Sequence, residues 1–227
     1  MGCNRNEWAC ADGLPALLAG EMGGVLMNKT KIDWADMTWN PVTGCLHDCP
    51  YCYARKIAER FGGCKWFEEY DVYGNYPVYE ARNDGKNHEL FERAITGDIN
   101  KYTVANYPHG FSPTFHRYRL DEPQQIKKPR NIFVCSMADL FGEWVPMVWI
   151  EEVLTACYKA PWHNYLFLTK NPKKYVELYE TGIISRAQNI WYGFTLTNSK
   201  NIDKTFDIIF NLQNQNTFLS IEPIMEK

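Results

Sequence analysis

Short apolar runs alternate with amphipathic stretches along the second half of the chain. The runs are rich in β-branched and aromatic residues, which is typical of buried strands, and the stretches between them have helical periodicity. The predicted strands are 131–135, 165–169, 189–195 and 217–221. The predicted helices are 146–159, 172–180 and 200–212. Strands that alternate with helices in this way indicate parallel βαβ units.

The first half of the chain gives weaker signals. Residues 38–43 predict a first strand and turn, and residues 114–120 predict a second strand. Residues 64–112 are irregular and rich in Tyr, Gly and Asn, apart from a helical stretch near residues 88–95. We interpret residues 64–112 as an insertion, because they interrupt the alternation of strands and helices.

A helix is predicted for residues 50–61, directly after the first strand and its turn. Asp48 or Cys49 can cap its amino end, Pro50 suits its first turn, and the pair Gly62-Gly63 ends it. The insertion would therefore follow the first helix.

About six strands can be counted, which is closer to a partial barrel than to a closed barrel of eight strands. We therefore expect an α/β fold, a partial (βα)6 barrel with an insertion after its first helix. The chain stops at Lys227, directly after the last predicted strand and without a helix to cover it. This ending predicts a domain that is truncated at its carboxyl terminus.

The composition favours one globular domain. Apolar residues make up 45% of the 227 residues, which is enough for a sizeable core. We assign residues 27–227 to this domain and residues 1–26 to a disordered extension or a start-site artefact, because Met27 is a plausible start. The first residues make a poor signal peptide, and no stretch is apolar enough to span a bilayer, so we expect a cytoplasmic protein without membrane contact.

Three of the eight cysteines fall within eight residues. Cys45, Cys49 and Cys52 have the spacing C-x3-C-x2-C, and the aromatic Tyr51 directly precedes the third cysteine. Three thiolates on one tight loop can hold three irons of a cubane cluster. The fourth iron is then open to a small molecule that chelates it.

This motif resembles the signature of the radical S-adenosylmethionine (SAM) superfamily, including the aromatic residue and the position after a first strand. More narrowly, the chain resembles an uncharacterised, phage-related branch described as phage proteins of unknown function. The segments that carry this likeness extend from residue 38 to residue 223 and are TWNPVTGC, CPYCYA, FVCSMADLFGEWVP, FLTKNP and FLSIEP.

The resemblance implies a partial barrel of the radical SAM type, a [4Fe–4S] cluster on Cys45, Cys49 and Cys52, and SAM as the ligand of the open iron. In that superfamily one electron from the cluster cleaves SAM to methionine and a 5′-deoxyadenosyl radical, which abstracts hydrogen from a substrate. A reductant such as a flavodoxin or a ferredoxin is implied as a partner. The glycine-rich SAM-binding motif of many members is not evident, and neither the substrate nor a catalytic residue is identified.

Polar residues directly follow the predicted strands. Functional residues cluster at the carboxyl ends of strands in parallel α/β folds. We therefore predict cofactor contacts for residues at these ends, and for the aromatic residue of the cysteine motif as a shield of the cluster: Ser136, Asp139, Thr169, Lys170, Thr195, Glu222 and Tyr51. Structural explanations stay open, because Ser136 can simply end its strand, Asp139 can cap a turn and Lys170 can be solvated.

Three other functions stay open. The cysteines could bind zinc with Cys64 or His47 as fourth ligand, although common zinc knuckles use paired C-x2-C elements and only one such pair is present. The chain could also be a non-catalytic iron–sulfur protein. A nucleic-acid-modifying enzyme is the third alternative, but the net charge of −3 does not indicate an electrostatic nucleic-acid binder.

Overall fold

The computed structural model describes residues 27–61, 72–73, 76–80, 107, 109–184, 187–197, 202–212 and 215–221. Residues 1–26, the predicted helix near 88–95, most of the predicted insertion, Cys64 and Glu222 lie outside these ranges. In the described part of the chain, no helix is both long enough and apolar enough to cross a membrane.

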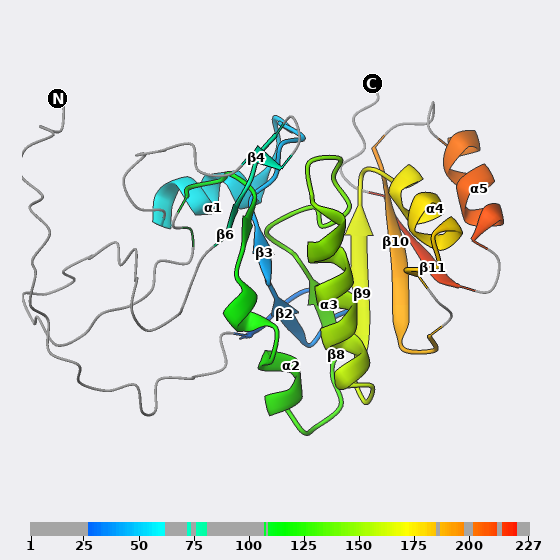
Figure 1. The fold of residues 1–227 in the computed structure, drawn as a ribbon, viewed down its shortest axis with the longest axis horizontal. Helices are drawn as coiled ribbons and strands as arrows, with labels where there is room; N and C mark the ends of the chain where they lie inside the picture. The colour runs from blue at the N-terminus through cyan, green and yellow to red at the C-terminus, as the bar shows by residue number, and fades with distance from the viewer. Residues whose placement is uncertain are drawn as a thin grey trace, which may run out of the picture.

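A six-stranded sheet forms the centre of the described structure (Figure 1). Its strands, in spatial order, are β1 (Asn28–Lys29), β2 (Met37–Trp39), β8 (Asn131–Val134), β9 (Asn164–Thr169), β10 (Ile190–Leu196) and β11 (Asn216–Ile221). The pairs from β2 to β11 are all parallel, and only β1 is antiparallel to its neighbour. The predicted parallel βαβ units of the second half are confirmed.

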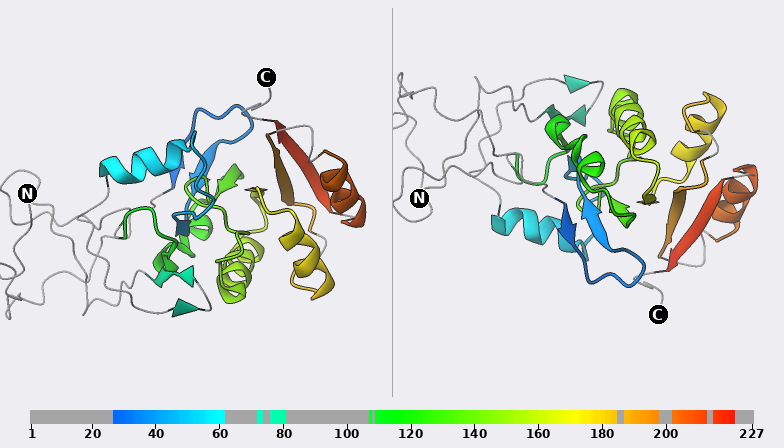
Figure 2. Two further views of the ribbon diagram at one scale, coloured as in Figure 1. Left: turned by 90° about the horizontal axis from the view of Figure 1, so that it is seen from above. Right: turned by 90° about the horizontal axis from the view of Figure 1, so that it is seen from below.

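Three helices cover one face of this sheet: α3 (Met147–Lys159), α4 (Lys173–Glu180) and α5 (Ile202–Asn211) (Figure 2). Alternate strand residues face them, as the period of two in a strand requires. Tyr192 of β10 and Tyr175 of α4 are both fully buried, with ring centroids 5.1 Å apart. Burying a large apolar side chain contributes about 1.5–3 kcal/mol, so this layer holds α4 against the sheet.

The predicted strand 114–120 is wrong in length and in place. Only β7 (Thr114–Phe115) is extended, and it pairs with β3 (Val42–Thr43) and β6 (Tyr79–Glu80) in a separate sheet. The chain then turns into the 3-10 helix η1 (Arg117–Arg119) and the short helix α2 (Glu122–Gln125), while β4 (Val72–Tyr73) and β5 (Tyr76–Pro77) form a further ribbon. The sixth strand of the main sheet is β1 instead.

His116 explains where β7 ends. Its backbone N–H donates to the Pro41 carbonyl at 2.7 Å, and its buried ring bonds through Nε2 to the hydroxyl of Thr43 at 2.8 Å. These bonds fix the chain beside β3, so residues 117–119 turn into η1 instead of extending β7.

Trp34, in the loop between β1 and β2, indicates that the sheet is curved. Its ring lies 4.8 Å from that of Phe133 on β8 and 5.8 Å from that of Phe218 on β11. In a flat sheet, β8 and β11 would be about 14 Å apart, because they are separated by three strand spacings of about 4.8 Å. Among the described strands the sheet does not close, since β1 and β11 are its edges, and the partial barrel stays a prediction.

The face that α3, α4 and α5 leave open holds a cavity of about 470 Å³. Its lining includes Trp34, Leu166, Trp191 and Phe218, with Asn131 and Asn164 at the amino ends of their strands. The cavity is therefore mostly apolar, and it extends from the amino ends of β8 and β9 to Leu219 and Ser220 near the carboxyl end of β11.

Candidate metal centre

The cysteine loop begins at the carboxyl edge of the main sheet. Gly44, directly after β3, forms a parallel bridge with Ala138, and its N–H donates to the Met137 carbonyl at 2.9 Å. The backbone of Gly44 has φ +84°, and a Cβ atom there would lie 2.2 Å from the Ser112 carbonyl oxygen. Only glycine fits at this point, and it places Cys45 next to the turn that follows β8.

Cys45, Cys49 and Cys52 are partly buried free thiols on this loop. The Cys52 N–H donates to the Cys49 carbonyl at 3.1 Å, which folds the loop into a turn before α1 (Tyr53–Phe61). The Cys52 sulfur then accepts the Arg55 N–H at 3.4 Å. Cys52 itself is therefore the cap of α1.

The predicted helix start at Pro50 is wrong by three residues, because Pro50 and Tyr51 form the turn that the Cys52 N–H closes. The correction places the third cysteine, rather than Asp48 or Cys49, at the amino end of the helix. Backbone N–H groups and the helix dipole favour negative charge at such an end. A thiolate-bound cluster, which carries net negative charge, suits this place.

Burial has a strong effect on the thiol of Cys45. It raises the pKa of Cys45 to about 12, with the backbone N–H of His47 acting in the opposite direction and the charge of Asp139 raising it further. The pKa of the Tyr51 phenol is also raised, first by burial and then by the charge of Cys49 and the hydrogen bond to its sulfur. Tyr51 is thus close enough to Cys49 to feel its charge, and its role as a shield of the loop stays a prediction.

Within the described ranges, no three His, Cys, Asp or Glu side chains are arranged to hold one metal ion. The chemistry of the loop still fits a metal group, because three thiols within eight residues are soft ligands of the kind that iron–sulfur clusters and zinc take. Ligation requires thiolates, so a bound metal would have to displace the proton of the buried Cys45 thiol.

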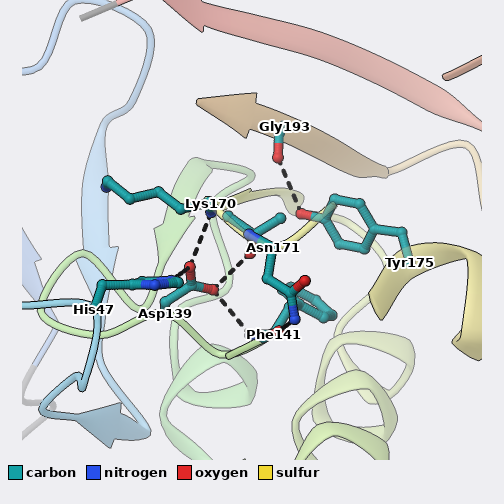
Figure 3. Close-up of polar contacts among 8 residues, drawn as sticks. His47, Asp139, Phe141, Lys170, Asn171, Tyr175 and Gly193 are labelled. Carbon is teal, nitrogen blue, oxygen red and sulfur yellow. Dashed lines mark hydrogen bonds and ion pairs between the residues drawn. The ribbon is translucent and has the colours of Figure 1, made fainter. Parts of the chain in front are cut away.

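Asp139 is the polar centre of this edge (Figure 3). Its carboxylate is buried, and each oxygen takes part in two hydrogen bonds. Oδ1 accepts from the Thr169 hydroxyl at 2.7 Å and the Phe141 N–H at 3.1 Å. Oδ2 lies 2.7 Å from His47 Nε2 and accepts the Lys170 N–H at 2.9 Å.

Burial by itself would raise the pKa of Asp139, but hydrogen bonds from His47, Lys170 and Thr169 together with the charge of His47 outweigh it and lower this pKa. Asp139 is therefore a carboxylate that only accepts, and His47 Nε2 carries the proton of the bond they share. The His47 ring also packs edge-on against Trp144, with centroids 4.8 Å apart. His47 is thus held on two sides.

The structure brings four of the predicted site residues to the ends of β8 and β9. Asp139, Thr169 and Lys170 share the hydrogen bonds described above, although the Lys170 side chain is exposed and points away from the carboxylate (Figure 3). Ser136 is held by other groups, since its hydroxyl donates to Asn40 Oδ1 at 3.1 Å and its carbonyl accepts the Tyr53 hydroxyl at 2.8 Å. The structural explanation for Asp139 holds in part, because its bond to the Phe141 N–H closes a turn.

Thr195 lies at the end of β10, where it pairs with Ser220 of β11. Its hydroxyl oxygen is buried and has no hydrogen-bond partner in the described part of the chain. The remaining predicted residue, Glu222, lies outside the described residues, and its role stays a prediction. Cys135 and Cys157 are buried residues of the main hydrophobic core.

Two residues of the site have roles that the sequence did not identify. The sequence predicts His47 only as a possible zinc ligand and predicts no cofactor contact for Asn40, yet Asn40 Oδ1 accepts bonds from both the Ser136 hydroxyl and the Met137 N–H. Their partners lie more than 90 residues away in the chain. The only available signal was the polar character of both residues beside the cysteine motif.

The fold and the site define a class of mixed α/β proteins in which a loop with three cysteines lies at the carboxyl edge of a mostly parallel sheet. More specifically, the chain belongs to the family described as "Protein of unknown function (DUF5131)", whose model matches residues 29–227. No curated protein and no solved structure shows a significant match to the chain.

Proposed function

We propose that this chain binds a [4Fe–4S] cluster through Cys45, Cys49 and Cys52 and is a radical SAM enzyme. The observation that carries the proposal is the bridge between Gly44 and Ala138, which puts the C-x3-C-x2-C loop beside the carboxyl end of β8. In parallel α/β proteins this edge is where cofactors and substrates bind. The strands follow one another in chain order, as the proposed partial barrel requires.

The chain's own residues prepare this place in three ways. Cys45, Cys49 and Cys52 supply the three sulfur ligands and leave one iron without a protein ligand. The amino end of α1 directs N–H groups toward the loop and favours its negative charge. Tyr51, whose pKa the neighbouring Cys49 helps to raise, is the side chain that would shield the bound cluster on one side.

When bound, the cluster and SAM supply the reductive cleavage that generates a 5′-deoxyadenosyl radical. Ser136, Thr169, Lys170 and Thr195 lie on the same edge and are the proposed contacts for SAM or the substrate, together with Glu222. A reductant such as a flavodoxin or a ferredoxin would supply the electron, and we propose a cytoplasmic location, where thiols stay reduced.

Anaerobic reconstitution tests the proposal. The protein should take up four irons and four sulfides, and after reduction by dithionite it should convert SAM to 5′-deoxyadenosine and change its electron paramagnetic resonance signal when SAM is added. Cys45→Ala, Cys49→Ala and Cys52→Ala should each abolish stable cluster binding. Cys157→Ala is the matched control, because Cys157 is buried in the core and should leave the cluster in place.

A zinc centre is the second candidate, and the pair His47–Asp139 is the observation that favours it. Histidines that bind metals commonly donate their other ring N–H to a carboxylate, as His47 does. Nδ1 of His47 would then be the fourth ligand, beside three thiolates. Protein that purifies with one zinc and no sulfide, and that does not respond to SAM after reconstitution, would replace the radical SAM proposal with this one.

A further inference from the structure

Asp139 joins three segments that are far apart in the chain. His47 belongs to the cysteine loop, Thr169 and Lys170 end β9, and Phe141 belongs to the turn after β8. One side chain thus connects the loop to two neighbouring strands of the main sheet. His47 contributes the only bond among these four that reaches the cysteine loop.

We propose that the hydrogen bond between Asp139 and His47, called the latch below, holds the cysteine loop in its metal-binding conformation before any metal is bound. We also propose that a protein without this bond loses its cluster faster. The second of these statements rests on the proposed function, whereas the first does not. Asp139 and His47 are positioning residues in this proposal, because they act on the cluster through the loop.

The hydrogen bonds of Asp139 argue against a direct contact with SAM. An ionised carboxylate has about four acceptor positions, and Asp139 takes part in four bonds within the protein. A ligand amino or hydroxyl group could bind there only by displacing one of them. Each of these bonds has a charged acceptor in a buried place, so displacing one would be costly.

The position of His47 makes the latch effective. It lies two residues after Cys45 and two before Cys49, and its own backbone N–H interacts with the Cys45 sulfur. A ring fixed by Asp139 on one side and by Trp144 on the other therefore fixes the part of the loop between two proposed ligands. Partners that orient ligands in this way commonly change metal affinity by roughly 10- to 100-fold when they are removed.

Four variants test the latch by removing the ring, the N–H donor or the carboxylate charge separately. His47→Ala removes the ring and the bond, His47→Phe keeps a ring without a donor, and His47→Gln keeps an N–H donor that can reach Asp139. Asp139→Asn removes the charge and replaces one acceptor by a donor. Asp207→Asn is the control, because Asp207 is an exposed carboxylate on α5 and loses the same charge elsewhere.

The first readout is independent of the cluster. In the metal-free protein, the N–H groups of Cys45 and Cys52, which donate to the Phe111 and Cys49 carbonyls, should exchange hydrogen roughly tenfold faster or more in His47→Ala, His47→Phe and Asp139→Asn, as expected for loss of a bond to a charged group. His47→Gln should stay closer to the wild type, and exchange in α5 should not change. Asp139→Asn removes a buried charge, so the three His47 variants suffice if it does not fold.

The second readout uses the reconstituted protein. Iron should be lost to a chelator roughly 10- to 100-fold faster in His47→Ala and His47→Phe, with His47→Gln intermediate. Asp139→Asn should also raise the midpoint potential of the cluster, because removing a nearby negative charge stabilises the reduced form. Asp207→Asn should match the wild type in both measurements.

The outcomes separate the two proposals. Wild-type protein that binds no cluster overturns the proposed function, while loop exchange in the metal-free protein still decides the latch. The latch is overturned if His47→Ala exchanges like the wild type, or if His47→Phe restores protection as well as His47→Gln does. It is also overturned if His47→Gln keeps the loop protected but loses metal as fast as His47→Ala, since His47 would then be a metal ligand.

Discussion

At the scale of single residues, the conformation of Gly44 decides where the cysteine loop begins. Its positive φ and the Ser112 carbonyl oxygen 2.2 Å from any Cβ exclude a side chain there. Gly44→Ala should therefore lower the free energy of unfolding by about 2–4 kcal/mol, from backbone strain and steric overlap together. Urea unfolding followed by circular dichroism measures this.

Gly182 provides the comparison for that experiment. It also has a positive φ, +77°, but a Cβ atom there would meet nothing within 4 Å. Gly182→Ala should cost only about 1 kcal/mol, because strain acts without overlap. Equal losses in the two variants would show that strain alone matters and that the contact with Ser112 is unimportant.

The residue scale also marks the limit of what the sequence could predict at the site. Cys45, Cys49 and Cys52 can be identified as candidate metal ligands because the spacing that indicates this role lies within eight consecutive residues. The bond between His47 and Asp139 joins residues 92 positions apart, so no local pattern contains it. Asp139 could be selected as a polar residue after a strand, but its partners could not.

At the scale of elements, the bond between His116 and Thr43 joins the end of β7 to β3 and predicts a dependence on pH. Burial lowers the pKa of His116 well below its usual value, and the nearby charges of Arg119 and His109 lower it further. The unfolded chain therefore binds more protons than the folded chain at pH values below about 6.5. Stability should be fully present above that pH and fall as the pH decreases toward the folded pKa.

Unfolding midpoints in urea at pH 7.5, 6.5, 5.5 and 5.0 test this dependence. A single histidine of this kind changes stability by at most about 1.4 kcal/mol per pH unit. His163, whose pKa is also lowered by burial, adds to the slope in the same direction. His116→Gln should reduce the slope, and a variant with the wild-type slope would exclude His116 as its source.

Elements were predictable where they are long and regular. The apolar runs of β9 and β10 and the helix α3 are confirmed within one or two residues, because each contains several turns or repeats of its own pattern. Residues 114–120 have an extended composition as well, but bonds from His116 to Pro41 and Thr43 turn the chain after two residues. Such tertiary competition outweighs local propensity in short segments.

At the scale of the whole molecule, Trp34 joins the two sides of the main sheet. Its ring contacts Phe133 and Phe218, which belong to strands separated by β9 and β10. Trp34→Ala should lower the free energy of unfolding by about 1–3 kcal/mol, since a half-buried aromatic side chain is lost. Phe210→Ala is a suitable control, because Phe210 is 71% exposed on α5 and should cost less than about 0.5 kcal/mol.

The order of the strands has a consequence for how the molecule assembles. β8, β9 and β10 each pair with the strand that is synthesised next in the main sheet, and Asn131 and Asn164 bond across only 33 positions. Bringing the cysteine loop to Asp139 closes 92 positions, which costs about 1 kcal/mol more in loop-closure entropy. During synthesis, the strands from β8 onward can associate as they emerge, and the N-terminal loop then docks onto a sheet that is already formed. The contact between the cysteine loop and Asp139 should thus be the last part of the described structure to form.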